Sequence, residues 1–199
     1  MWGVDPDSVH LRWHSPSGAT DSMASGEVAD PAPFSGSGCP SGKACRWTDA
    51  VLVRYTDTSA WIGKVALAFG SSPFTITGYL TYHEAPWYVE GWPALAKTGR
   101  STGSRWVTSA VNYCYNFYPD SATYQSAGVT IRSNWAMLCQ NSAALVSSSG
   151  DSGGPVYAYQ PDGLTYLDGI LHASSGATTI WSTAGGLLWD LDINLRPYP

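Results

Sequence analysis

Gly150-Asp151-Ser152-Gly153-Gly154-Pro155 places one serine between small, turn-forming residues. Glycines on both sides of Ser152 let the backbone bend sharply and let another group approach it closely. A serine hydroxyl exposed on such a turn can act as a nucleophile, and the backbone N–H groups of Gly150 and Ser152 can point at one spot and hold an oxyanion. Because Gly, Asp, Ser and Pro are also ordinary turn residues, a plain surface turn is the alternative.

The composition of the 199-residue chain favours an all-β fold. Charged residues make up 13% of it, whereas 21 glycines and 13 prolines supply many turns. Ser, Thr, Val, Tyr and Trp are abundant, and several of these residue types favour strands. The net charge is −5 with no basic run, which argues against nucleic acid as a partner. No apolar run reaches the roughly 18 residues of a membrane span, so no membrane partner is expected either.

The four cysteines predict an oxidising compartment. Cys39 and Cys45 bracket a turn-rich insert, and Cys114 and Cys139 lie in apolar, strand-like runs. Cys39–Cys45 with Cys114–Cys139 is the economical choice among three possible pairings. Disulfides indicate a secreted protein, whereas four buried free thiols are the alternative. No Cys-x-x-Cys spacing is present, and neither a metal site nor a cofactor is predicted.

Short strands separated by turn clusters are predicted along the chain, as in an antiparallel barrel or sandwich. An aromatic, proline-containing connector at 85–93 is the predicted boundary between two halves, 1–90 and 91–199. A short C-terminal helix is predicted at 187–195. The predicted strands are 9–13, the apolar run after Asp49, 61–68, 74–80, 94–98, 107–117, 128–131, 135–140, 156–159, 167–173 and 186–191.

Three stretches resemble the streptogrisin and alpha-lytic protease group of bacterial chymotrypsin-like serine proteases. They are 150–155, the Lys-Thr-Gly-Arg-Ser-Thr-Gly run at 97–103, and the run at 46–55, which is similar to the strand that carries the aspartate of the catalytic triad. The resemblance implies two antiparallel β-barrels with an active site between them. It also implies a secreted endopeptidase that forms an acyl-enzyme on Ser152 and uses Asp49 to orient a histidine. Its partner would be a peptide or protein substrate, and a complete enzyme is expected to be a monomer.

The histidine of the triad has no match in the chain. In the group it precedes the aspartate in a motif like Thr-Ala-x-His-Cys, which is absent here. We therefore expect the strands that carry it to precede Met1, which leaves the first barrel incomplete. His10 and His14, which lie 39 and 35 positions before Asp49, are the alternatives. Two other functions stay open, namely an inactive homologue that binds peptides or proteins, and a non-catalytic β-domain.

The resemblance also assigns an ion pair and a substrate pocket. A buried carboxylate needs a partner, so Asp151 is expected to pair with Lys97, with Arg100 as second choice and a solvated Lys97 as the alternative. Val146 stands where trypsin-like members carry an aspartate, which predicts a preference for apolar or small residues before the scissile bond. The predicted pocket residues are Val146, Ser147, Ser148, Ser149, His172, Ala173 and Ser174.

Overall fold

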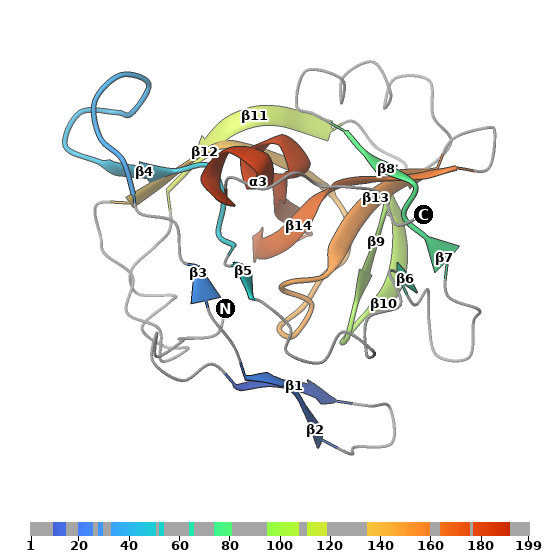
Figure 1. Ribbon diagram of the computed structural model, residues 1–199. Coiled ribbons are helices and arrows are strands. Elements are labelled where there is room, and N and C mark those ends of the chain that lie inside the picture. The colour runs from blue at the N-terminus through green and yellow to red at the C-terminus, as the bar shows by residue number, and fades with distance from the viewer. Residues whose placement is uncertain are drawn as a thin grey trace.

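The computed structural model shows a protein that is mostly β, with one short helix near the C-terminus (Figure 1). It describes residues 10–14, 20–25, 28–29, 33–50, 52–53, 64–65, 74–80, 95–107, 111–118, 135–159, 164–175 and 177–191. All structural statements below concern these residues.

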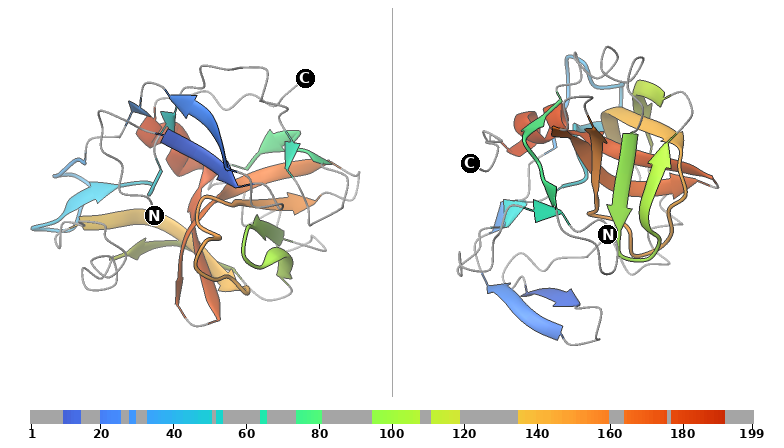
Figure 2. Two further views of the ribbon diagram at one scale, coloured as in Figure 1. Left: turned by 90° about the horizontal axis from the view of Figure 1, so that it is seen from below. Right: turned by 90° about the vertical axis from the view of Figure 1, so that its right-hand side faces the viewer.

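Nine strands form the main sheet. Seven of them run in the order β10-β9-β13-β14-β15-β12-β11, and all neighbours in this path are antiparallel. Their bounds are β9 Leu95–Gly99, β10 Gly103–Val107, β11 Val111–Phe117, β12 Trp135–Ala144, β13 Pro155–Tyr159, β14 Thr165–Ser175 and β15 Thr178–Thr183. Two short strands join in parallel, β4 (Ala44–Arg46) beside β12 and β8 (Gly78–Tyr79) beside β14. The sheet is strongly twisted and curved (Figure 2).

The remaining described strands form three two-stranded sheets. These pair β1 (His10–His14) with β2 (Thr20–Ser25), β3 (Val28–Ala29) with β5 (Leu52–Val53), and β6 (Lys64–Val65) with β7 (Phe74–Thr75). The strand pairing of the described residues therefore gives one large sheet and three small ones. Two separate barrels, and a domain boundary near residue 90, stay predictions.

The main hydrophobic core is formed mostly by side chains of β9, β12, β13, β14 and β15. It contains the largest fully buried side chain, Trp181 on β15, which is 0% exposed. Burial of each large apolar side chain contributes about 1.5–3 kcal/mol relative to exposure. The cluster consists of Leu80, Leu95, Ala143, Leu145, Val156, Ala158, Leu171 and Trp181.

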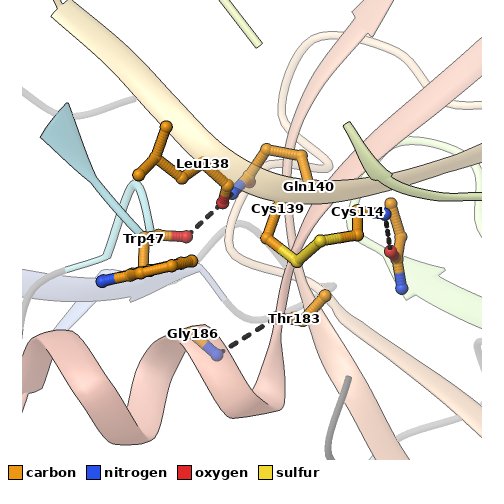
Figure 3. Close-up of a disulfide and its surroundings, with 8 residues drawn as sticks. Trp47, Cys114, Leu138, Cys139, Gln140, Thr183 and Gly186 are labelled. Atoms are coloured by element: carbon orange, nitrogen blue, oxygen red, sulfur yellow. Dashed lines mark hydrogen bonds between the residues drawn. A yellow bond between two sulfur atoms is a disulfide. The ribbon is translucent and has the colours of Figure 1, made fainter. Parts of the chain in front are cut away.

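The prediction was wrong for the C-terminal end of the sheet. The strand β15 was not predicted, and 186–191, which was predicted to be a strand, is helical. The helix α3 (Ala184–Leu191) begins three residues before the predicted helix start at 187. Thr183 caps it, because its Oγ1 accepts a hydrogen bond from the Gly186 N–H at 3.1 Å (Figure 3). The sequence did not predict this start because the first turn contains two glycines, and glycine is a poor helix former.

Four of the other predicted strands are confirmed. Those at 94–98, 135–140, 156–159 and 167–173 lie in β9, β12, β13 and β14. The run predicted as one strand at 107–117 is divided, because β10 ends at Val107 and β11 begins at Val111. The strand predicted at 128–131 lies outside the described residues.

The disulfides join Cys39 to Cys45 and Cys114 to Cys139, the pairing that the sequence favours. Cys114 and Cys139 lie on the neighbouring strands β11 and β12 and have positive φ angles of 50° and 54°. The register between these strands shifts between Asn112 and Tyr115, the stretch that contains Cys114, and again between Tyr115 and Phe117. The bridge lies beside Gln140, a residue of the site described below (Figure 3).

Candidate active site

Ser152 lies on the turn that leads from β12 into β13, and this turn depends on its glycines. Gly150 and Gly153 have φ angles of +96° and +85°, in the left-handed region that side chains disfavour. A Cβ on Gly154 would overlap the carbonyl oxygen of Thr98 on β9. The glycines on both sides of the serine are therefore required by the backbone itself.

Two backbone N–H groups of this turn are unused. The N–H groups of Asp151, Gly153 and Gly154 donate to carbonyl oxygens at 2.8–3.0 Å. Among the described residues, the N–H groups of Gly150 and Ser152 have no protein acceptor. These are the two donors expected for an oxyanion.

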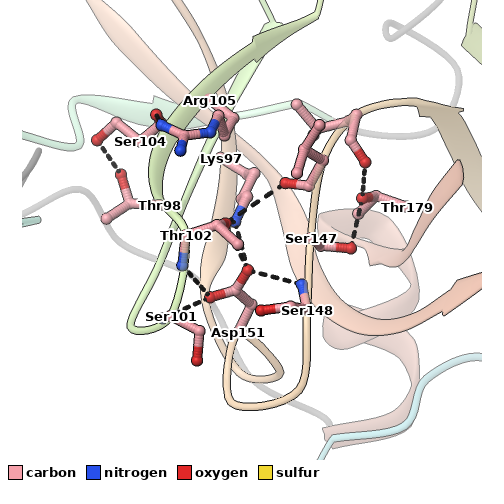
Figure 4. A network of polar contacts seen from close by, with 12 residues as sticks. Lys97, Thr98, Ser101, Thr102, Ser104, Arg105, Ser147, Ser148, Asp151 and Thr179 are labelled. Atoms are coloured by element: carbon pink, nitrogen blue, oxygen red, sulfur yellow. Dashed lines mark hydrogen bonds and ion pairs between the residues drawn. The ribbon is translucent and has the colours of Figure 1, made fainter. Parts of the chain in front are cut away.

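Asp151, directly before the serine, is 1% exposed and is surrounded by hydrogen-bond donors (Figure 4). The Lys97 ammonium lies 2.6 Å from its Oδ2. Burial alone would raise the pKa of Asp151, but the hydrogen bonds from Lys97 and the other donors outweigh burial and lower it to about 2. The other donors are the hydroxyl of Thr102 at 2.6 Å and the backbone N–H groups of Ser101 (2.7 Å), Thr102 (3.1 Å) and Ser148 (3.1 Å).

The turn between β9 and β10 therefore packs against the serine turn and holds it in place. Lys97 is 0% exposed, and its ammonium also donates to the Thr102 hydroxyl. The Ser101 hydroxyl donates to the Ser149 carbonyl at 2.6 Å. Arg100, the second choice as partner of Asp151, is exposed instead, and its guanidinium lies beside Gly150. The sequence analysis identified Lys97 and Asp151, but it did not identify Ser101 and Thr102 as further donors to Asp151.

Asp49 is half-buried, and the segment before it is fixed by the C-terminal half of the chain. The backbone N–H of Asp49 donates to the Ser182 hydroxyl at 3.1 Å. The Gln140 side chain donates to the carbonyl of Trp47 at 2.8 Å (Figure 3). Asp190 on α3 accepts three hydrogen bonds from Trp47 and Thr48. None of these three supporting side chains was predicted as a site residue.

A series of hydrogen bonds leads from the Asp49 backbone to Ser152. The Ser182 hydroxyl donates to Gln140 Oε1 at 2.8 Å, and His172 Nε2 lies 2.9 Å from the same oxygen. The carbonyl of His172 lies 3.4 Å from the Ser152 hydroxyl, which donates to it. The structure thus brings the Asp49 segment and Ser152, 103 positions apart in the sequence, onto one hydrogen-bonded framework.

The imidazole of His172 does not face Ser152 as a base. Its Nε2 carries the proton, because Gln140 Oε1 can only accept, and its Nδ1 has no hydrogen-bond partner among the described residues. Burial lowers the pKa of His172 to about 3, so the ring is neutral at ordinary pH. The side chains of His10 and His14, and the whole of His83, lie outside the described residues.

The predicted pocket residues lie on two segments, the loop that follows β12 and leads to the Ser152 turn, and β14. Val146 is 58% exposed, and Ser148, Ser149 and Ser174 are also exposed, whereas Ser147 and Ala173 are half-buried. Thr179 on β15 lies 2.7 Å from the Ser147 hydroxyl and donates to the Leu145 carbonyl. The sequence missed Thr179 because it missed β15.

The described residues contain no group of three or more His, Cys, Asp or Glu side chains that could hold a metal ion. They also include no helix long and apolar enough to cross a membrane.

No model of a known protein family and no curated protein matches the chain. One similar solved structure is a glutamic acid specific serine protease, described as using a novel histidine triad in substrate binding. The TM-score is 0.47 and the sequence identity 23%, and the match covers 71% of this chain. It covers 64% of the other chain, so this chain spans less than two thirds of that protein's length.

Proposed function

We propose that the protein is a secreted serine endopeptidase of chymotrypsin-like fold, in which Ser152 attacks a peptide carbonyl. The observation that carries the proposal is the turn itself. Lys97 and the β9–β10 turn hold Asp151, and no acceptor among the described residues binds the N–H groups of Gly150 and Ser152. Preorganised N–H donors of this kind stabilise the oxyanion of a tetrahedral intermediate.

The chemistry would proceed in two halves. The Ser152 oxygen bonds to the carbonyl carbon while a histidine takes its proton, and the same histidine then protonates the departing amine. Water hydrolyses the resulting acyl-enzyme by the reverse sequence of proton transfers. Asp49 would fix the orientation of that histidine. The uncharged residues at 146–149 favour an apolar or small side chain before the scissile bond.

A peptide-binding module without catalysis is the second candidate. One observation favours it: among the described residues no imidazole is bonded to the Ser152 hydroxyl, which instead donates to the carbonyl of His172. Without a base, only oxyanion stabilisation and substrate binding would remain, which amounts to about 10³–10⁴-fold over the reaction in water.

A fluorophosphonate probe and peptide substrates separate these functions. A protease of this type is labelled on Ser152, releases a burst of product, and cleaves after Phe or Ala faster than after Arg. Ser152→Ala abolishes both labelling and turnover. If the unmodified chain shows neither, the endopeptidase assignment is wrong for this chain. Saturable binding of an uncleaved peptide by that same chain would then support the binding module.

The identity of the base can be tested in the same assay. His10→Ala, His14→Ala and His83→Ala are compared with the unmodified chain for the rate of Ser152 labelling. If Asp49 orients a histidine of this chain, one of the three variants loses labelling by several orders of magnitude. His172→Gln should retain labelling, because the His172 imidazole is engaged with Gln140.

A further inference from the structure

Asp190, in the last turn of α3, is a buried carboxylate directed at the segment before Asp49. Its side chain is 6% exposed. One oxygen, Oδ2, accepts from the Trp47 N–H at 2.9 Å, the Thr48 N–H at 2.7 Å and the Thr48 hydroxyl at 2.9 Å. The Arg46 guanidinium lies 4.0 Å from the same oxygen. Three donors from one short segment thus converge on a single oxygen of a largely buried carboxylate.

These contacts determine the path of the backbone into Asp49. The N–H groups of three consecutive residues are bound, two by Asp190 and the third, that of Asp49, by Ser182. Because the peptide planes on the N-terminal side of Asp49 are held, the direction of its Cα–Cβ bond is largely set. The carboxylate of Asp49 can then be directed without contacting Asp190.

The packing of α3 also helps to fix the backbone of Trp47 and Thr48. A Cβ on Gly186 would lie 2.9 Å from the Trp47 carbonyl and 3.2 Å from the Thr48 methyl group, so the first turn of the helix lies against this segment. The Gln140 side chain, on β12, donates a hydrogen bond to the Trp47 carbonyl. The segment is therefore held by three elements of the half that carries Ser152, namely β12, β15 and α3.

We infer that Asp190 is a positioning residue for Asp49, and through Asp49 for the reaction at Ser152. The inference rests on the proposed function, because it assigns Asp190 a part in orienting the triad. Asp190 touches neither substrate nor reacting atoms. It acts by fixing the Trp47–Thr48 backbone, so that the carboxylate of Asp49 meets the histidine at the productive angle.

The test compares Asp190→Ala and Asp190→Asn in the full chain, with Trp189→Ala as a matched control. Trp189 is on the same helix, adjacent in sequence and 68% exposed. Asparagine retains an oxygen that can accept the three hydrogen bonds but loses the charge, whereas alanine loses the acceptor. Active sites are counted with the fluorophosphonate probe, and kcat is expressed per labelled site.

Displacement of a catalytic group by about 1 Å costs on the order of 10²-fold. We therefore expect Asp190→Ala to lower kcat per labelled site by about 10²-fold with little change in KM. Asp190→Asn should restore most of this loss, and Trp189→Ala should resemble the unmodified chain. A purely structural role would reduce the number of labelled sites and leave kcat per site unchanged, and this result would overturn the inference.

A second readout does not need activity. Amide hydrogen exchange of Trp47 and Thr48 is compared with that of Leu171, whose N–H donates to the Gly154 carbonyl. Loss of the acceptor should speed exchange at Trp47 and Thr48 by about tenfold in Asp190→Ala, relative to Leu171. The carbon-13 chemical shift of the Asp49 carboxyl should change in the same variant.

The two readouts distinguish the failure of each proposal. If the unmodified chain neither labels nor turns over, the endopeptidase assignment fails for this chain, and exchange together with the carbon-13 chemical shift of the Asp49 carboxyl still decides the role of Asp190. If exchange at Trp47 and Thr48 and the carbon-13 chemical shift of the Asp49 carboxyl are unchanged in Asp190→Ala, Asp190 does not position Asp49, whatever the activity.

Discussion

Replacing Lys97 by methionine would leave the Asp151 carboxylate buried without a cationic partner. Removal of one member of a buried ion pair typically costs ~3–5 kcal/mol. A second figure comes from the pKa of Asp151, which is about 2 in the folded protein and 3.8 without the fold. That difference corresponds to about 2.5 kcal/mol of net stabilisation at neutral pH, after the cost of burying the carboxylate is subtracted from the contribution of the donors. Because Thr102, Ser101 and Ser148 still donate in the variant, we expect a loss of about 3 kcal/mol.

The assay is urea unfolding monitored by tryptophan fluorescence, with Arg105→Met as the matched control. Arg105 is the cross-strand partner of Lys97 on β10, and it is exposed. Its replacement should change the free energy of unfolding by no more than about 0.5 kcal/mol. For a chain of this size, a loss of about 3 kcal/mol lowers the Tm by roughly 6–12 °C. A Lys97→Met protein as stable as Arg105→Met would refute the role assigned to the ion pair.

The pH dependence gives an independent check with a definite sign. In the unmodified chain the lowered pKa of Asp151 stabilises the fold above pH 3.8, and this contribution is lost as the pH falls towards 2. In Lys97→Met burial should dominate and raise the pKa of Asp151, so that acid stabilises the variant. Asp151→Asn in the same chain removes the buried charge, and the double variant should recover part of the lost stability.

Three further perturbations test the serine turn and the buried His172 beside it. Gly150→Ala should abolish fluorophosphonate labelling, because Gly150 has a φ of +96° and its new Cβ would lie 2.5 Å from the Ser101 hydroxyl. Gly154→Ala should lower the Tm in thermal unfolding, since its Cβ would overlap the Thr98 carbonyl; an unchanged Tm contradicts this packing. In the unmodified chain the neutral, buried His172 should cost stability as the pH falls from 6.5 towards 3, about 3 kcal/mol by pH 4.5. His172→Gln should remove this slope from urea titrations, and an identical slope would contradict the lowered pKa.

The features that could be predicted from the sequence are local. The Gly-Asp-Ser-Gly-Gly-Pro turn places Ser152, Gly150 and Asp151 within three positions, and the positive φ angles explain why glycine recurs there. The pairing of Lys97 with Asp151 spans 54 positions and was expected for another reason: a buried carboxylate needs a partner, and the resemblance of the run at 97–103 to the protease group implied Lys97. The strand β15 was missed because its Ser and Thr side chains are buried together with Ile180 and Trp181, so no polar–apolar alternation marks it.

The polar residues that support Asp49 could not be predicted in the same way. Asp190 and Ser182 lie more than 130 positions from their partners in the Thr48–Asp49 segment. Gln140 occupies the middle of a buried strand, where an amide is ordinarily unfavourable. Only the folded chain shows that both ends of its side chain are satisfied, by the Trp47 carbonyl and by Ser182.

This arrangement has a consequence for how the site is assembled. The acceptors and donors that hold the Asp49 segment come from β12, β15 and α3, and the Ser152 turn continues from β12 into β13. β12, β15, β14 and β13 are successive neighbours in the main sheet. The spacing between the proposed acid and the proposed nucleophile is therefore set mainly by this sheet and its terminal helix. A histidine delivered to the gap between them, from whichever part of the polypeptide, would meet partners whose positions the C-terminal half has already fixed.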